Sequence, residues 1–175
     1  MYEGKFPTKR YQKTIEFLKD TVSTNEAILD LGVVNPFTEY MTQEGYDVLN
    51  TKGEDLDLDV SPVKNSDRPV LTAFEILEHL VSPFALLQES SANKLVASVP
   101  LKLWFASAYK SKSDERDRHY HEFEDWQFDW LLEKAGWHIV KREKFTNPVK
   151  KVGLRPILRR FTPRYYLVYA ERIKK

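Results

Sequence analysis

Two groups of histidines and carboxylates are the side chains best suited to acid–base chemistry. Glu78 directly precedes His79, and a second group holds His119, His121 and Glu122. Because histidine titrates near neutral pH, His79 or His119 could take a proton from a substrate hydroxyl or amine. Two imidazoles and a carboxylate can also bind zinc or iron, but the second group would need a further ligand from elsewhere in the chain. We therefore expect a catalytic base at His79 or His119, and no metal.

A second set of candidates follows a short apolar run at residues 27–31. Asp30 lies within this run, Gly32 follows it, and Asn35 precedes a proline. Asparagine can cap the free N–H groups of a helix, and proline is favoured at the first helical position. In sheets of parallel strands, ligands bind beyond the carboxyl ends of the strands, where a strand passes into a helix. The pattern therefore fits either an ordinary strand-to-helix turn or a ligand site.

The spacing of apolar residues predicts the elements that position these side chains. The expected strands are 27–31, 46–49, 70–74, 94–99, 138–143 and 165–170. The expected helices cover 9–22 and 123–135, and two more begin after Asn35 and Ser82. Alternating acids and leucines over 53–59 predict an exposed edge strand. This order predicts one α/β domain over residues 1–175, with a doubly wound, mostly parallel sheet and a terminal antiparallel strand.

The composition limits the class of protein. The chain has 175 residues, of which 42% are apolar and none is cysteine, so a disulfide scaffold and a cysteine-based zinc site are excluded. Residues 141–175 carry twelve Lys and Arg and two acids, a net charge of +10. The basic connection at 147–164 could therefore contact an anionic partner, or it could pair with the chain's own acids. The charged N-terminus and the absence of a long apolar run predict a cytoplasmic protein without a membrane span.

Three segments resemble the class I S-adenosylmethionine-dependent methyltransferases, in particular the small methyltransferase-domain group. Residues 28–32, Ile-Leu-Asp-Leu-Gly, resemble the first strand and the start of the cofactor loop. Residues 72–80, which contain Glu-His-Leu, resemble the fourth strand and the motif behind it. Residues 119–123 and 131–137 resemble the late His-x-x-x-Phe segment, the helix after it and the Ala-Gly-aromatic turn. The segments stand in the same order as in that family.

The resemblance implies that the chain binds S-adenosylmethionine at the loop around Gly32. The family usually places further glycines in this loop, whereas two valines follow Gly32 here. The family's second strand usually ends in an acid that binds the ribose, and the equivalent position here falls near Asn50 or Thr51. Asp55 and Asp57 could supply the missing hydrogen-bond acceptors, or they could be charges that protect an edge strand from aggregation.

Further site residues follow from the same resemblance. The family places cofactor and substrate contacts at the end of the fourth strand, which implies roles for Phe74 and Glu75. Asp30 would hold the loop or meet the methionine amine of the cofactor. Asn35 caps a helix N-terminus and could face a carboxylate of a ligand. The implied reaction is methyl transfer to an unidentified small molecule or macromolecule, with His79 or His119 as the base. Two alternatives stay open: a methyltransferase-like module that binds without catalysis, and an adaptor that holds an anionic partner through the basic C-terminal segment.

Overall fold

The structure is a computed structural model that describes residues 8–112, 114–146 and 153–173. Its centre is a six-stranded sheet with the strand order β2-β1-β3-β4-β6-β5. The strands are β1 (Ile28–Asp30), β2 (Val48–Asn50), β3 (Val70–Phe74), β4 (Lys94–Pro100), β5 (Trp137–Phe145) and β6 (Tyr165–Arg172). Strands β1 to β4 pair in parallel, and β6 is antiparallel to both of its neighbours. The predicted α/β fold with a terminal antiparallel strand is confirmed.

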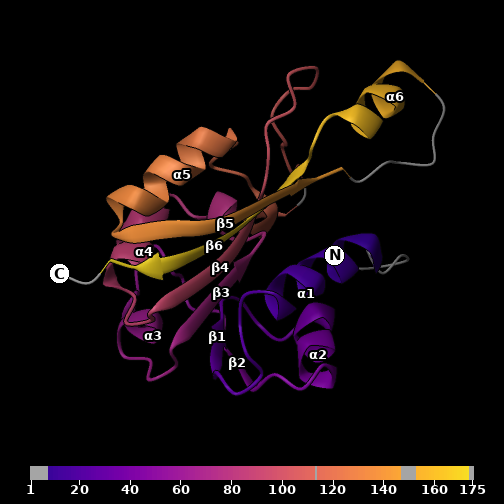
Figure 1. The fold of residues 1–175 in the computed structure, drawn as a ribbon. Coiled ribbons are helices and arrows are strands. Elements are labelled where there is room, and N and C mark those ends of the chain that lie inside the picture. Colours follow the sequence, from indigo (N-terminus) through magenta and orange to yellow (C-terminus); the bar gives the residue numbers. More distant parts are fainter. Residues whose placement is uncertain (1–7, 113, 147–152, 174–175) are drawn as a thin grey trace.

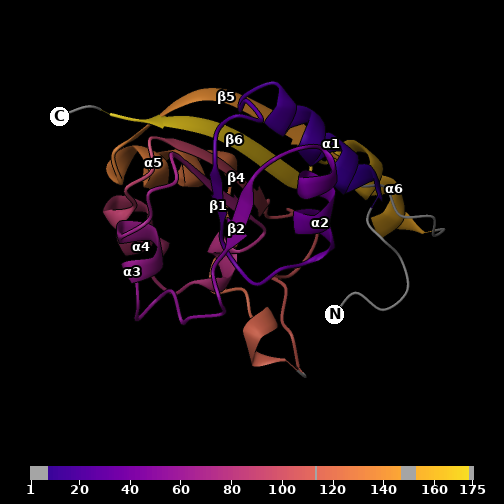
Figure 2. The same cartoon turned by 90° about the horizontal axis from the view of Figure 1, so that it is seen from below.

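Helices cover both faces of the sheet, as Figures 1 and 2 show. One face carries α1 (Thr8–Lys19) and α2 (Pro36–Gln43). The other face carries α3 (Ser61–Lys64), α4 (Pro83–Glu89) and α5 (Asp125–Lys134). A further helix, α6 (Leu154–Phe161), lies beyond the ends of β5 and β6 that it connects (Figure 1). Among the described residues, no helix has the length and apolar character needed to cross a bilayer.

The central strands are apolar along most of their length because both of their faces are covered. Leu29, Leu71 and Leu95 are neighbours in the sheet register and belong to the core on the side of α4 and α5. Ile28 and Val70 belong instead to the core beneath α1 and α2. Successive side chains on a strand point to opposite faces, so short continuous apolar runs were sufficient to predict these strands.

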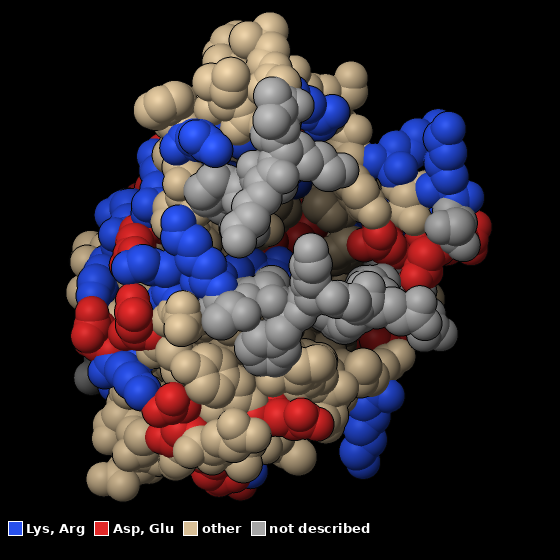
Figure 3. All heavy atoms as spheres, turned by 90° about the vertical axis from the view of Figure 1, so that its right-hand side faces the viewer, with Lys and Arg blue, Asp and Glu red and all other residues tan. Residues whose placement is uncertain are grey.

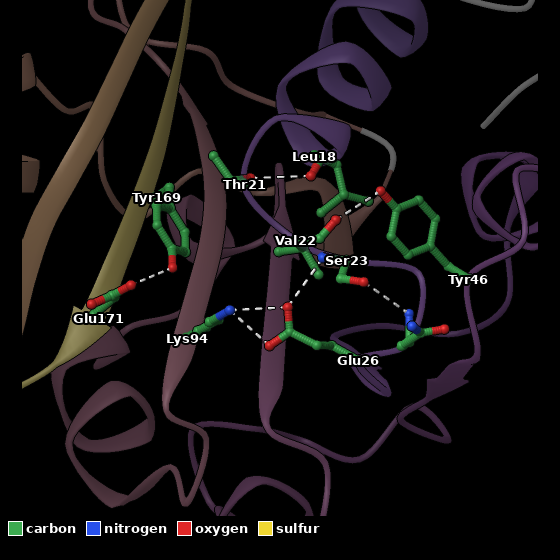
Figure 4. A network of polar contacts seen from close by, with 10 residues as sticks. Leu18, Thr21, Val22, Ser23, Glu26, Tyr46, Lys94, Tyr169 and Glu171 are labelled. Carbon is green, nitrogen blue, oxygen red and sulfur yellow. Dashed lines mark hydrogen bonds and ion pairs between the residues drawn. The ribbon is translucent and has the colours of Figure 1, made fainter.

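A network of polar contacts ties the amino ends of the central strands to the segment after α1 (Figure 4). The Lys94 ammonium at the start of β4 lies 2.7 Å from a carboxylate oxygen of Glu26, which precedes β1. The same carboxylate accepts a hydrogen bond from the backbone N–H of Ser23 at 3.1 Å. The Tyr46 hydroxyl donates to the carbonyl of Val22 at 3.2 Å. These contacts stabilise the opposite end of the strands from the one that forms the candidate site.

The segment 53–59 forms turns and loop, so the prediction of an exposed edge strand there was wrong. The Asp55 carboxylate accepts a hydrogen bond from the backbone N–H of Asp57 at 3.1 Å and closes an Asx turn. The Asp57 carboxylate accepts hydrogen bonds from the backbone N–H groups of Val81 (2.9 Å) and Ser82 (2.7 Å), just before α4. The carboxylates therefore accept hydrogen bonds from backbone N–H groups. The alternating sequence pattern alone does not distinguish such a loop from an exposed strand.

Two helices differ in detail from the sequence expectations. The connection at 147–164 contains α6, a helix that was not expected; Lys150 and Lys151 of this basic connection lie outside the described residues. On α5, Trp126 and Trp130 are 44% and 64% exposed, and a different stripe, which includes Phe128, packs into the core. The helix predicted over 123–135 is present as α5, and its exposed tryptophans show that large aromatic residues do not mark its buried face.

Candidate functional site

The carboxyl ends of β1, β3 and β4 border a cavity of about 330 Å³. Its volume is within the range of small-molecule sites, about 300–1,000 Å³. Six of the predicted site residues line it: Asp30, Asn35, Phe74, Glu75, His79 and His119. Further lining residues come from α1 and from the segments beside β4 and β6: Arg10, Tyr11, Thr14, Tyr109, Asp117 and Arg164. The fold therefore brings together residues that are up to 155 positions apart in the sequence, from Arg10 to Tyr165.

Asp30 is a buried anchor at the end of β1. Its carboxylate accepts hydrogen bonds from the Thr72 hydroxyl (2.6 Å), the Asn50 amide (3.0 Å) and the Thr38 hydroxyl (3.4 Å). Burial raises the pKa of Asp30 to about 6, and these three hydrogen bonds oppose the rise. Asp30 thus connects β1 with β3, β2 and α2, in addition to lining the cavity.

Gly32 makes the turn from β1 toward α2. Its φ of +99° is a conformation that residues with a Cβ rarely adopt. The Gly32 N–H donates to the Thr51 hydroxyl at 2.8 Å, and its carbonyl accepts from the Asn50 amide at 3.1 Å. A Cβ at this position would lie 3.5 Å from the Ile76 side chain, an ordinary van der Waals distance. The glycine is therefore required by backbone conformation rather than by crowding.

Asn35 caps α2, as the sequence predicted. Its side-chain oxygen accepts hydrogen bonds from the backbone N–H groups of Phe37 (2.9 Å) and Thr38 (3.2 Å). The Thr38 hydroxyl completes a capping box with the Asn35 backbone N–H. Asn35 therefore has two roles, because it caps α2 and also lines the cavity.

Asn50 stands at the end of β2, where the resemblance predicts a group that binds the ribose. Its amide nitrogen donates hydrogen bonds to the Asp30 carboxylate, to the Gly32 carbonyl and to the Thr38 hydroxyl at 3.3 Å. Its side-chain oxygen is buried and has no hydrogen-bond partner in the described part of the chain. A buried acceptor without a donor is costly, so a hydroxyl group of a ligand would stabilise this position.

Four predicted site residues are not among those that line the cavity: Gly32, Asn50, Asp55 and Asp57. Asn50 lines a neighbouring hollow of about 800 Å³ beside α2 and β2. Asp55 is exposed, and Asp57 is engaged with the two backbone N–H groups before α4. Their proposed contact with the cofactor stays a prediction. The structure places both of them in a different hydrogen-bonding role.

Phe74 and Glu75 lie where β3 ends. The Phe74 ring packs edge-on against the ring of Phe37 on α2, with centroids 5.2 Å apart. Glu75 has a positive φ of 54°, accepts a hydrogen bond from the Ser98 hydroxyl at 2.8 Å and forms an ion pair with Arg10 at 3.6 Å. Burial raises the pKa of Glu75, although the positive charge of Arg10 opposes the rise. A strained backbone at an acidic residue is typical of functional sites.

Glu78, His79 and His119 form a compact cluster on the other side of the cavity. The His79 Nε2 atom lies 3.7 Å from a Glu78 carboxylate oxygen, and the two imidazole rings meet edge to face with centroids 4.7 Å apart. Burial and the neighbouring Glu75 charge raise the pKa of Glu78 well above its usual value. Burial, followed by the proximity of His79, lowers the pKa of His119. These three residues are the group within the described chain that could hold a metal ion.

His121 and Glu122 are turned to other partners, although the sequence groups them with His119. The His121 Nε2–H donates to the carbonyl of Val81 at 3.2 Å, and Glu122 accepts a hydrogen bond from the backbone N–H of Tyr109 at 2.6 Å. Proximity in the sequence therefore did not predict which side chains lie together at the cavity. The partner of His119 is the Glu78–His79 pair, some forty residues earlier in the chain.

Several lining residues had no signal in the sequence. Arg10 and Tyr11 belong to an amphipathic helix whose apolar spacing indicates packing only, and Arg164 is one of many basic residues near the C-terminus. The short helical turn Leu77–His79 was not expected either, although it is what places Glu78 and His79 beside the cavity. Only the three-dimensional arrangement distinguishes these residues from solvent-exposed charges.

No protein-family model matches the chain, and no curated protein sequence matches it. Solved structures do match it. An S-adenosylmethionine-dependent methyltransferase from Mesorhizobium loti gives a TM-score of 0.61 at 16% identity, over 90% of this chain and 96% of that one. The N-terminal domain of EvdMO1, solved with S-adenosylhomocysteine bound, gives 0.51 at 12% identity, over 98% and 82%. The cyclase SpnF gives 0.61 at 11% identity, over 99% and 84%.

These likenesses concern the fold, because the sequence identities are low. Strand order, the antiparallel sixth strand and the position of the cavity agree with the resemblance carried by the three sequence segments. The chain has the fold of the class I S-adenosylmethionine-dependent methyltransferases.

Proposed function

We propose that the chain binds S-adenosylmethionine and transfers its methyl group to an acceptor. The observation that carries this proposal is the convergence of six predicted site residues on one cavity at the carboxyl ends of the parallel strands. Ligands of open α/β sheets bind at this edge. A shared fold alone does not establish a reaction, as the cyclase among the similar structures illustrates.

The residues present fit the cofactor at two points. Gly32 holds the backbone in the turn that such a loop needs, and the unpartnered Asn50 oxygen offers an acceptor for a ribose hydroxyl. Asp30, Phe74 and Glu75 would contact the part of the cofactor that enters the cavity. When bound, the cofactor supplies a methyl group that its positively charged sulfur has already activated. The protein then mainly aligns the acceptor with that methyl group, which requires little from its side chains.

His79 and His119 are proposed to act on the acceptor. Both line the cavity, and the buried Nδ1 of His119 has no hydrogen-bond partner in the described part of the chain. A neutral imidazole at this position could accept the proton that an acceptor hydroxyl or amine gives up. The cytoplasmic location predicted from the sequence is retained as part of this proposal.

Calorimetric titration with S-adenosylhomocysteine tests the proposal, because binding of this product does not require knowledge of the acceptor. One molecule should bind per chain. Binding together with transfer of a labelled methyl group would support the enzyme, whereas binding without transfer to any acceptor would favour the non-catalytic module. The altered glycine loop is the feature that keeps this second candidate open.

The acceptor is proposed to be anionic. A second cavity of about 400 Å³ lies between α6 and the segment after β4, and Arg155, Arg159 and Arg164 line it. The Nε atom of Arg159 is buried there without a hydrogen-bond partner among the described residues. Arg164 also borders the first cavity, so an anion held here would lie beside the candidate site. Lys and Arg are more numerous in the upper half of the face in Figure 3 than in its lower half.

An anionic acceptor predicts salt-sensitive binding. We expect single-stranded RNA or heparin to bind at low salt, and the RNA affinity to fall by about 0.7 log units per log unit of salt for each phosphate neutralised. The double variant Arg155→Glu/Arg159→Glu should lose this binding. The variant Lys52→Glu/Lys134→Glu changes the net charge equally at exposed positions outside the cavity and should retain most of it. Equal losses in both variants would show a general charge effect and refute a built anion site.

A further inference from the structure

The Glu78–His79–His119 cluster has the composition of a metal site. Each residue offers one ligand atom, and the three atoms lie within 4.8 Å of one another. Metal bonds of about 2.1 Å in a tetrahedral site place the ligand atoms roughly 3.4 Å apart. The separation of 3.7 Å between His79 Nε2 and the Glu78 carboxylate is already close to this value. A small rotation of the His119 ring would bring its ligand nitrogen to a similar distance from the other two ligand atoms.

Two of the three residues have buried polar atoms without a partner in the described part of the chain. These are the second carboxylate oxygen of Glu78 and the Nδ1 atom of His119. The Glu78 residue is only 1% exposed, so water does not readily compensate this carboxylate. Buried carboxylates are normally paired, hydrogen-bonded or bound to a metal. A ligand with positive charge would supply the missing interaction at Glu78, whose pKa burial otherwise raises.

The surrounding backbone fixes the orientation of the cluster. The His79 Nδ1–H donates to the carbonyl of Arg118 at 3.0 Å, which leaves the lone pair of Nε2 directed toward Glu78. Metal-binding histidines usually donate their other ring N–H to such a carbonyl or carboxylate. The Glu78 carbonyl accepts hydrogen bonds from the backbone N–H groups of Tyr120 (2.8 Å) and His121 (3.2 Å). The segment that carries His119 is thereby held in register with Glu78.

Charges of both signs surround the cluster. The carboxylate of Glu75 lies near enough to Glu78 to affect it, which adds negative charge to the same region. Arg10 forms an ion pair with Glu75, and Arg164 donates to the carbonyl of Leu101 at 2.5 Å. The positive charges of both guanidinium groups also act on Glu78, and that of Arg164 acts on His119.

We propose that Glu78, His79 and His119 bind a divalent transition-metal cation on the acceptor side of the cavity. Two imidazoles and one carboxylate favour zinc, manganese, iron or cobalt over calcium, which prefers oxygen ligands. Three protein ligands leave at least one coordination position open, as in catalytic rather than structural sites. This assignment replaces the expectation that the site holds no metal, and it gives the two histidines a different role from that of a free base.

The open position gives the cation a use in the proposed reaction, and only this step rests on the proposed function. An acceptor hydroxyl bound there would lose its proton to water more readily, because a metal ion lowers the pKa of a bound oxygen. The oxygen would then form the new bond to the methyl carbon as the carbon–sulfur bond breaks and its electron pair returns to sulfur. The preferred acceptor is consequently one with a hydroxyl group.

Calorimetric titration of the full chain with Zn²⁺ alone tests the site without any cofactor. The wild type should bind one equivalent, and His119→Ala should weaken the affinity by at least about a hundredfold, since outer partners of metal ligands already contribute ten- to a hundredfold. His138→Ala is the matched control, because His138 is an exposed histidine on β5 outside the cavity. This variant should bind like the wild type, as should His121→Ala.

X-ray absorption of the Zn²⁺-bound wild type provides a readout that does not depend on a folded variant. Its spectrum should contain the scattering pattern of two imidazoles, with the remaining ligands being oxygen. No Zn²⁺ binding by the wild type, a spectrum without two imidazoles, or equal losses in His119→Ala and His138→Ala would each overturn the proposal. Because S-adenosylhomocysteine is absent from these measurements, a negative result leaves the proposal of cofactor binding untouched.

Discussion

Replacing Gly32 by alanine is expected to weaken S-adenosylhomocysteine binding by at least about tenfold. A residue with a Cβ at a φ of +99° carries strain of about 1–3 kcal/mol. The loop would relieve this strain by rotating, and the rotation would break the hydrogen bonds that Gly32 makes with Thr51 and Asn50. A tenfold loss corresponds to about 1.4 kcal/mol, which lies within that range.

Gly45→Ala is the matched control for this effect. Gly45 has a φ of +93°, and a Cβ there would meet only the Thr24 side chain at 3.9 Å. Both variants should lose about 1–2 kcal/mol of unfolding free energy, because the backbone conformation is similar. Only Gly32→Ala should lose affinity for the ligand. Unchanged affinity in Gly32→Ala would mean that Gly32 serves the strand-to-helix turn and nothing more.

The stability of the protein is expected to depend on the protonation of Asp30. The folded state raises the pKa of this buried carboxyl from 3.8 to about 6, so folding favours the protonated form. Its stabilising contribution is fully present below about pH 4 and is lost as the pH rises through about 6. The free-energy difference between these limits is about 3 kcal/mol, because each pKa unit corresponds to about 1.4 kcal/mol.

The variant Asp30→Asn isolates this contribution, since it keeps the shape of the side chain but cannot ionise. Urea unfolding of both proteins from pH 4 to pH 8 should show that the wild type loses about 3 kcal/mol relative to the variant. Other carboxyl groups affect both proteins alike and cancel in the comparison. Parallel stability curves across this range would show that Asp30 is ionised in the folded protein with an ordinary pKa.

The sequence was informative where burial imposes a pattern. Continuous apolar runs predicted β1, β3, β4 and β6, because strands covered on both faces have no polar side. The edge strand β5 instead alternates buried and exposed side chains. Asn35 followed by proline predicted the start of α2, where local hydrogen bonds determine the structure. The Ala-Gly-aromatic turn was also located correctly, and its Trp137 is fully buried with its N–H donating to the Leu87 carbonyl at 3.1 Å.

The sequence was less informative where function depends on distant contacts. The alternating acids at 53–59 resembled a strand because the spacing does not reveal whether a carboxylate meets solvent or a backbone N–H group. His119 was grouped with its neighbours His121 and Glu122, whereas its partners come from the turn after β3. Likewise, Arg10 and Arg164 reach the cavity only because α1 and β6 fold over the same strand ends.

Cofactor binding at the carboxyl ends of the strands can be tested with a crystal structure of the chain grown with S-adenosylhomocysteine. We expect the ligand to occupy the cavity bordered by Asp30, Phe74 and Glu75 and to extend to β2, where a ribose hydroxyl donates to the side-chain oxygen of Asn50. A crystal without ligand at saturating concentration would contradict cofactor binding at the strand ends. So would a ligand bound elsewhere, for example in the cavity of about 400 Å³ that Arg155 and Arg159 line.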